Sequence, residues 1–182
     1  ELWKLLYTQL EKTTPEKRQI TVLLGFLSSC AESDSAFYSS MLDNLINDDL
    51  LGDSFPLFQT SVSIDRQGVE RLNEALDIGK VKIETFRYLA GGRIHESISD
   101  DDLAGLLEKI LIKEDGIGVA IDILGMRFYG SKDSLQDHSG ELTAVARNAL
   151  LLFTFPDAER GRSNNLGYHM AMIARATLNG PE

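Results

Sequence analysis

Apolar residues recur with the 3.6-residue period of an α-helix along almost the whole chain, and glycines and prolines interrupt that pattern at short intervals. The clearest apolar stripe is formed by Leu103, Leu106, Leu107, Ile110 and Leu111. Ser99 precedes this stripe as a capping residue, and Asp102 follows three positions later in a near capping box. Short helices bury such stripes only against one another, so the sequence predicts an all-α fold of antiparallel helix pairs.

Capping and helix-breaking residues divide the chain into the expected elements. The expected helices begin near Leu2, Pro15, Asp34, Asp65, Val81, Ser99, Gly116, Leu142 and Leu166. Residues 48–63 are expected to form a connector with a short helix near Leu57, and residues 158–165 a polar loop. Segments 81–86 and 116–123 are also compatible with strands, because they are rich in β-branched residues. We favour helices there, since the apolar positions fit the helical period better.

The chain has 182 residues, a length that suits one domain or one block of repeats. We expect a single helical array, with N-terminal helices and a connector over residues 1–64 and about three helix-pair units over residues 65–182. The helical pattern starts in the first turn after Glu1, with no capping residue before it. This start predicts that the chain is a piece of a longer protein.

A weak internal repeat has a period of 35 residues, which leads from Leu72 to Leu107 and from Leu107 to Leu142. The same offset leads from Leu89 to Leu124 in the partner helices. This spacing resembles, at the level of architecture, the HEAT and armadillo families of helical repeats. The resemblance implies an α-solenoid of stacked helix pairs, and an irregular α-helical bundle is the alternative. The stretch over residues 86–107 also resembles helical regions of larger bacterial multidomain proteins, some of them defence-associated ATPases.

The formal net charge of −10 argues against nucleic acid as a partner, because phosphate binding depends on clustered lysine and arginine. The acidity also disfavours anionic membrane surfaces, and the longest apolar runs are far too short to span a bilayer. Cys30 is the only cysteine, and its apolar neighbours predict a buried, unreactive thiol. These features fit a cytoplasmic protein whose partner is another protein or another domain of the parent chain.

No part of the sequence has a recognised catalytic, cofactor or metal signature. Residues Asp100, Asp101 and Asp102 could ligate a cation, but their place at a helix start favours capping. The three histidines, at positions 95, 138 and 169, match no metal-binding pattern and are expected at the surface or in loops. The Gly116-Ile117-Gly118 stretch lacks the third glycine of a dinucleotide site and the lysine of a P-loop. We therefore expect no enzymatic activity, no cofactor and no metal.

Three glycines lie inside expected helices, at positions 25, 105 and 125. Each costs about 1 kcal/mol of helix stability relative to alanine, and close helix packing would justify that cost.

Arginines and tyrosines near the ends of successive second helices are the candidate partner-binding residues, because these residue types are enriched in binding hot spots. They are Arg87, Tyr88, Arg93, Arg127 and Tyr129. The alternative is that they lie on solvated faces or pair with nearby acids. The sequence thus predicts an interaction scaffold, and the alternative function is a regulatory or sensor region of a multidomain bacterial ATPase or nuclease.

Overall fold

The computed structural model describes residues 1–129, 138–154 and 165–179. Every regular element in these ranges is a helix, which confirms the all-α class. The strand alternatives for segments 81–86 and 116–123 are wrong: the first forms part of the 3₁₀ helix η3 (Ile83–Ala90), and the second belongs to α7 (Gly116–Tyr129). The predicted polar loop lies almost wholly outside the described residues.

The N-terminal third contains α-helices of 11 to 13 residues together with shorter helical turns. They are α1 (Leu2–Lys12), η1 (Pro15–Lys17), α2 (Thr21–Ser33), α3 (Ser35–Ile46), η2 (Gly52–Ser54) and α4 (Phe55–Gln59). Asp34 caps α3 as expected, since its carboxylate accepts a hydrogen bond from the Phe37 amide at 3.0 Å. The Thr14–Pro15 pair opens only the 3₁₀ turn η1, and α2 begins later, at Thr21.

The described remainder contains α-helices of 12 to 14 residues and shorter 3₁₀ helices. They are α5 (Arg66–Ile78), η3, η4 (Ile94–Ser97), α6 (Asp100–Leu111), α7, α8 (Gly140–Leu152) and α9 (Leu166–Asn179). Asp65 caps α5 through the Gly68 amide at 2.8 Å. At the start of α6, Ser99 accepts from the Asp102 amide at 3.2 Å and donates to the Asp102 carboxylate at 2.7 Å. The predicted capping role of Ser99 is therefore confirmed.

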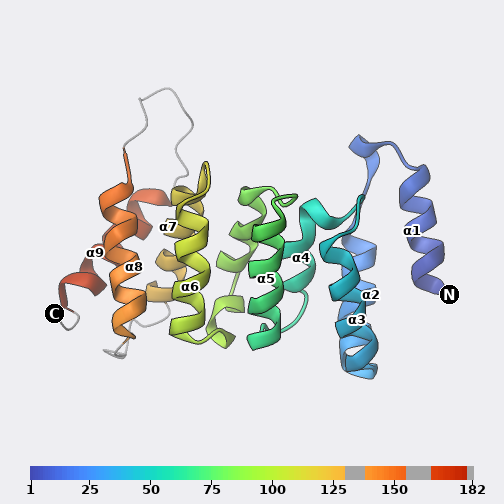
Figure 1. Ribbon diagram of the computed structural model, residues 1–182, viewed down its shortest axis with the longest axis horizontal. Helices are drawn as coiled ribbons and strands as arrows, with labels where there is room; N and C mark the ends of the chain where they lie inside the picture. Colours follow the sequence, from blue (N-terminus) through green and yellow to red (C-terminus); the bar gives the residue numbers. More distant parts are fainter. Residues whose placement is uncertain (130–137, 155–164, 180–182) are drawn as a thin grey trace.

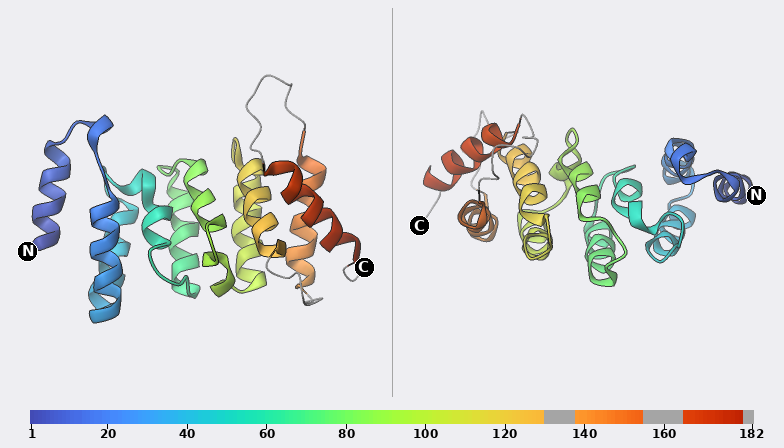
Figure 2. Two further views of the ribbon diagram at one scale, coloured as in Figure 1. Left: turned by 180° about the vertical axis from the view of Figure 1, so that it is seen from behind. Right: turned by 90° about the horizontal axis from the view of Figure 1, so that it is seen from above.

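The helices form two layers that lie side by side, and within each layer the helices follow one another along the longest axis of the molecule (Figures 1 and 2). In the first layer, α3, α5, α6 and α8 pack against one another in that order. In the second layer, α4 packs on η3, η3 on α7 and α7 on α9. The layers are joined where α4 contacts α5, α6 contacts α7 and α8 contacts α9. At the N-terminal end, α1 packs on α2 and α2 on α3.

The core lies between these layers and continues from one helix pair to the next. Leu107 and Leu142 are both 0% exposed, so the prediction that they are buried is confirmed. Leu72, Leu89 and Leu124 are also 0% exposed. None of the helices that the structure describes combines the length and the apolar character that a membrane crossing requires.

Glycine allows close backbone approach at two places in this core. A Cβ atom on Gly116 would lie 1.9 Å from the Ile110 carbonyl oxygen, so only glycine fits the tight turn from α6 into α7. A Cβ atom on Gly125 would lie 2.4 Å from the His169 Cβ, where α7 crosses α9. By contrast, Cβ atoms on Gly25 and Gly105 would meet open space. The expectation of close packing is thus correct for Gly125 and wrong for the other two.

Candidate interaction surfaces

The five predicted partner-binding residues come from three places in the fold: Arg87 and Tyr88 lie on η3, Arg93 lies just before η4, and Arg127 and Tyr129 lie on α7. Arg93 lies just before η4 with a side chain that is 85% exposed, and its Nη2 pairs with Glu96 Oε2 at 2.8 Å. Tyr88 is 47% exposed on η3. Arg87 and Arg127 make contacts with different elements, as described next.

Arg127 belongs to a largely buried group of polar side chains that we call the inner network: Arg127, Asp100 and His138. The Asp100 Oδ1 accepts hydrogen bonds from Arg127 Nη2 at 2.7 Å and from Arg127 Nε at 3.2 Å. The other carboxylate oxygen accepts from the Ser139 amide at 2.9 Å and lies 3.2 Å from His138 Nδ1. The Arg127 guanidinium also donates to the carbonyl oxygens of His95 and Ile98, at 2.6 and 3.0 Å. The inner network therefore ties α7 to η4, to the start of α6 and to the start of α8.

Electrostatics in the inner network favour the ionised form of Asp100. Burial by itself raises the pKa of this carboxyl, but the hydrogen bonds from Arg127 and the Ser139 amide and the nearby positive charges outweigh burial and lower the pKa. The role of Asp100 thus goes beyond the helix-start function expected for the Asp100–Asp102 cluster, since its partners come from residues far along the chain.

A second group, the outer network, has the same residue types: Arg87, Asp122 and His169. The Arg87 Nε lies 3.0 Å from Asp122 Oδ2, and His169 Nδ1 lies 3.0 Å from Asp122 Oδ1. Asp122 on α7 therefore joins η3 to α9 within the second layer. Arg87 is 49% exposed, whereas His169 is buried against α7.

The buried positions of His95 and His169 correct the expectation of surface or loop histidines. His95 is only 2% exposed, and both of its buried ring nitrogens lack a hydrogen-bond partner in the described residues. Burial, together with the nearby Arg127 charge, lowers the pKa of His95. His95 is thus held in its neutral form.

Two exposed tyrosines come together at the C-terminal end of the second layer. The ring centroids of Tyr129 on α7 and Tyr168 on α9 are 6.0 Å apart, and the side chains are 41% and 47% exposed. Tyr168 also lies next to His169, with 6.2 Å between the ring centroids, and this contact connects the pair to the outer network. We call Tyr129 and Tyr168 the tyrosine face. Tyr168 was absent from the sequence-based candidates because only the packing of α9 on α7 brings it beside Tyr129.

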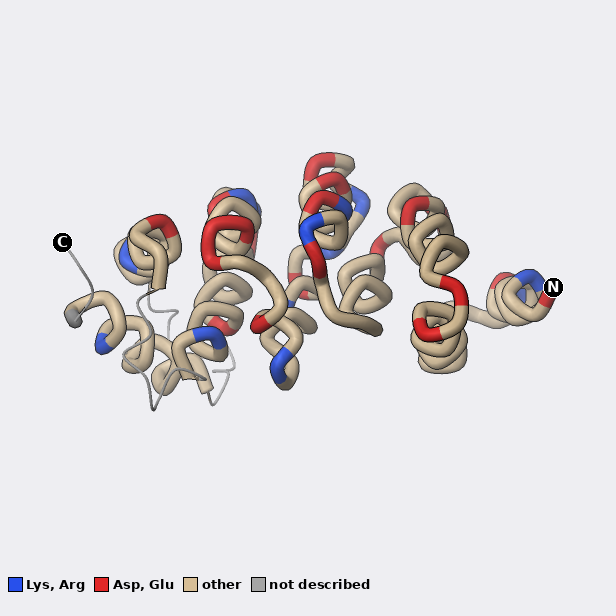
Figure 3. The backbone as a smooth tube through the Cα atoms, turned by 90° about the horizontal axis from the view of Figure 1, so that it is seen from below, with Lys and Arg blue, Asp and Glu red and all other residues tan. Residues whose placement is uncertain are grey.

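On the first layer, a shallow groove of about 780 Å³ runs between α5 and α6. Its lining, which we call the α5–α6 groove, is rich in carboxylates from both helices, including Glu74 and Asp101. Figure 3 shows that charged positions gather along these two helices of the first layer. This groove was not predicted, because each helix taken alone only has an ordinary solvated face.

No group of His, Cys, Asp or Glu residues suited to holding a metal ion is present in the described ranges. Cys30, expected to be buried, is partly exposed and packs against the edge of the core.

Comparison with known proteins gives no relative for this chain: no family model, no curated protein and no solved structure matches it. The function must therefore be inferred from the geometry of the surfaces described above.

Proposed function

We propose that this chain is an α-solenoid interaction module, loosely HEAT-like, that binds a protein partner or another domain of its parent protein in the cytoplasm. The proposed module has no catalytic activity, cofactor or metal of its own. The order of packing within the two layers supports the solenoid, since each helix contacts the corresponding helix of the next pair. The shared burial of Leu72, Leu107 and Leu142, at a spacing of 35 residues, supports the same repeat.

The tyrosine face is the observation that carries this proposal. Tyrosine rings offer a large apolar contact area with few rotatable bonds, and tyrosine and arginine are enriched among residues that dominate binding energies. The Arg87 guanidinium is held by Asp122 and remains half-exposed, so it is pre-oriented for a partner's carboxylate or carbonyl group. Arg127 is left out of the proposed surface, because its hydrogen bonds are directed into the inner network. The regulatory role in a multidomain ATPase or nuclease stays a prediction.

Affinity purification from the source cell with quantitative mass spectrometry tests this proposal, followed by titration of the purified partner. The Tyr129→Ser/Tyr168→Ser variant should lose the partner, with a dissociation constant raised by about thirtyfold, as expected for loss of a hot spot. The matched control is Ile112→Ser/Leu151→Ser, which removes two exposed apolar side chains elsewhere. A third variant, Tyr88→Ser, reports whether the partner extends over η3.

The proposal fails if the tyrosine variant keeps its helical circular dichroism spectrum and binds every partner of the wild type with unchanged affinity. Loss of binding in the control variant alone would place the partner elsewhere on the molecule.

A further inference from the structure

We propose that the α5–α6 groove binds a helical segment of a protein partner that presents lysine or arginine residues along one face. This inference goes beyond the proposed function, because the groove lies in the first layer and the tyrosine face in the second.

The charge balance of the groove favours a cationic ligand. Its lining contains the carboxylates Glu70, Glu74, Asp77, Asp101 and Asp102, and the cations Arg66 and Lys109. Both cations are already paired with acids of the lining. Arg66 Nε lies 3.5 Å from Glu70 Oε1, and Lys109 Nζ lies 2.9 Å from Asp77 Oδ2. In the part of the chain that the structure describes, no cation pairs with Glu74 or Asp101, so a negative charge remains for a partner to neutralise.

The spacing of the α5 acids matches a helical ligand. Glu70, Glu74 and Asp77 stand at positions i, i+4 and i+7 of one helix, all on the groove side. At about 1.5 Å of rise for each residue, these carboxylates are spread along about 10 Å of the groove. A second helix lying along the groove would place basic residues at the same intervals opposite them.

A further feature of the lining suits a ligand that approaches closely. Gly105 lies in the lining of the groove, where a Cβ atom would meet nothing within 4 Å, so the α6 backbone is open to a close neighbour.

The shape of the groove favours a peptide segment over a small molecule. Small-molecule sites are enclosed, whereas this groove is shallow, open to solvent and lined by side chains from both α5 and α6. The α5 helix has 13 residues, which corresponds to about 20 Å of groove. A ligand helix of three to four turns would cover that length.

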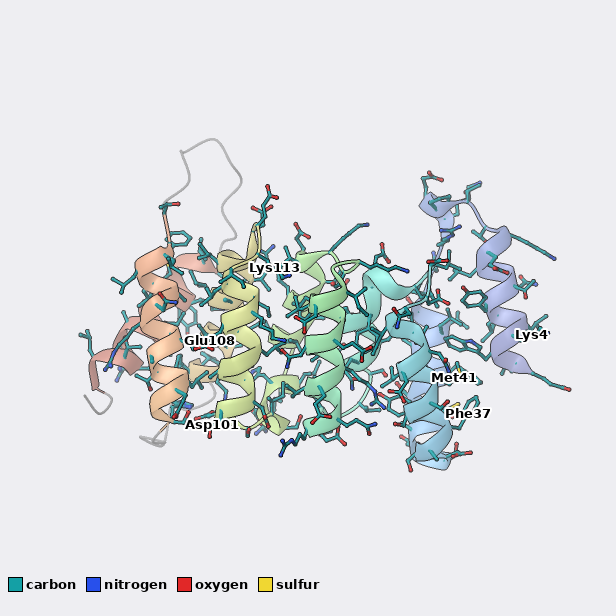
Figure 4. All side chains as sticks on the ribbon, viewed as in Figure 1. Lys4, Phe37, Met41, Asp101, Glu108 and Lys113 are labelled. Atoms are coloured by element: carbon teal, nitrogen blue, oxygen red, sulfur yellow. The ribbon has the colours of Figure 1, made fainter. Side chains whose placement is uncertain are left out.

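Fluorescence anisotropy with a labelled peptide tests the inference. The probe is an alanine-rich helical peptide with lysines at positions i, i+4 and i+7, and the control peptide has the same composition with the lysines scattered around the helix. The test variant is Glu74→Gln/Asp101→Asn. The matched control is Glu84→Gln/Glu108→Gln, which makes the same change in net charge at exposed acids outside the groove. Figure 4 shows that Asp101 and Glu108 lie at different heights along α6.

We expect the test variant to raise the dissociation constant of the probe by about tenfold, and the control variant to raise it by less than about twofold. Binding should also weaken between about 50 and 200 mM salt, because screening acts on exposed charges. Equal losses in the two variants would show attraction by net charge alone and would overturn the proposal. Equal binding of the two peptides, or no binding of the probe by the wild type, would also overturn it. None of these outcomes affects the tyrosine face, which is intact in every variant.

Discussion

The inner and outer networks contain the same three residue types in the same order of contact, with one aspartate between an arginine and a histidine. They differ in how deeply the arginine is buried. The Arg127 side chain is 13% exposed and donates to backbone carbonyl groups as well as to Asp100, whereas the Arg87 side chain is 49% exposed and forms an ion pair with Asp122.

Two groups with the same three residue types can therefore have different roles in one small fold. A buried ion pair adds modest net stability, but removing one partner is costly because the other charge is left without compensation. Around a half-exposed arginine, water can replace the lost partner. We therefore expect substitutions in the inner network to lower the free energy of unfolding strongly, and substitutions in the outer network to lower it only slightly.

The largest expected effect follows from Asp100→Ala. This change leaves the largely buried Arg127 guanidinium without its carboxylate, so we expect the free energy of unfolding to fall by about 3 to 5 kcal/mol in urea denaturation. Asp101→Ala is the matched control, because the neighbouring aspartate is exposed. Similar losses in the two variants would mean that the first turn of α6 depends on helix-dipole charge and not on the inner network.

The next effect concerns the helix contact beside the outer network. In Gly125→Ala, the new methyl group overlaps the His169 side chain, so α9 must shift and the contact between His169 and Asp122 is strained. We expect destabilisation by about 1 to 3 kcal/mol, as for other overpacked cores. The control Gly105→Ala should instead stabilise by about 0.5 to 1 kcal/mol, because its Cβ atom meets open space in the middle of a helix. Destabilisation of similar size in both variants would contradict the close crossing of α7 and α9.

A pH dependence of stability should follow from the burial of His95 beside the inner network. The pKa of His95 is lowered in the folded protein, first by burial and then by the Arg127 charge. The unfolded chain therefore binds the proton more readily, and stability falls as the pH decreases below about 6.5. The loss should approach about 1.4 kcal/mol for each pH unit until the folded-state pKa is reached, and above pH 6.5 it should vanish.

The pH effect is measured as the difference in unfolding free energy between the wild type and His95→Leu, at a series of pH values from 7.5 to about 5. The difference should change with pH in favour of the leucine variant as the solution becomes more acidic. A difference that stays constant over this range would show that His95 titrates normally.

The smallest expected effect follows from Asp122→Asn in the outer network. The asparagine can still accept a hydrogen bond from Arg87, and water reaches the half-exposed guanidinium. We expect a loss of about 1 kcal/mol in urea denaturation, which is the usual value of one hydrogen bond. A loss as large as that of Asp100→Ala would remove the contrast between the two networks.

The helices themselves could be predicted from the sequence, because their determinants are local. The apolar period and the capping groups of Asp34, Asp65 and Ser99 act within one or two turns, and the structure has helices that begin at each of these places. The burial of Leu107 and Leu142 followed from the same pattern. These features need no knowledge of which helix packs on which.

The candidate surfaces depended on contacts between residues far apart in the chain, which the pattern of one helix cannot specify. Arg127 resembled an exposed hot-spot residue, but the packing of α7 brings it to Asp100, 27 positions earlier. Tyr168 became a candidate only because α9 crosses α7 at Gly125, and the groove acids face one another only because α5 lies beside α6. The sequence by itself determined where the helices form and which side of each is apolar, since hydrogen bonds within a turn and periodic burial are local. The tertiary structure alone decided which charges are buried and which remain for a partner, because desolvation depends on the neighbours that each side chain meets.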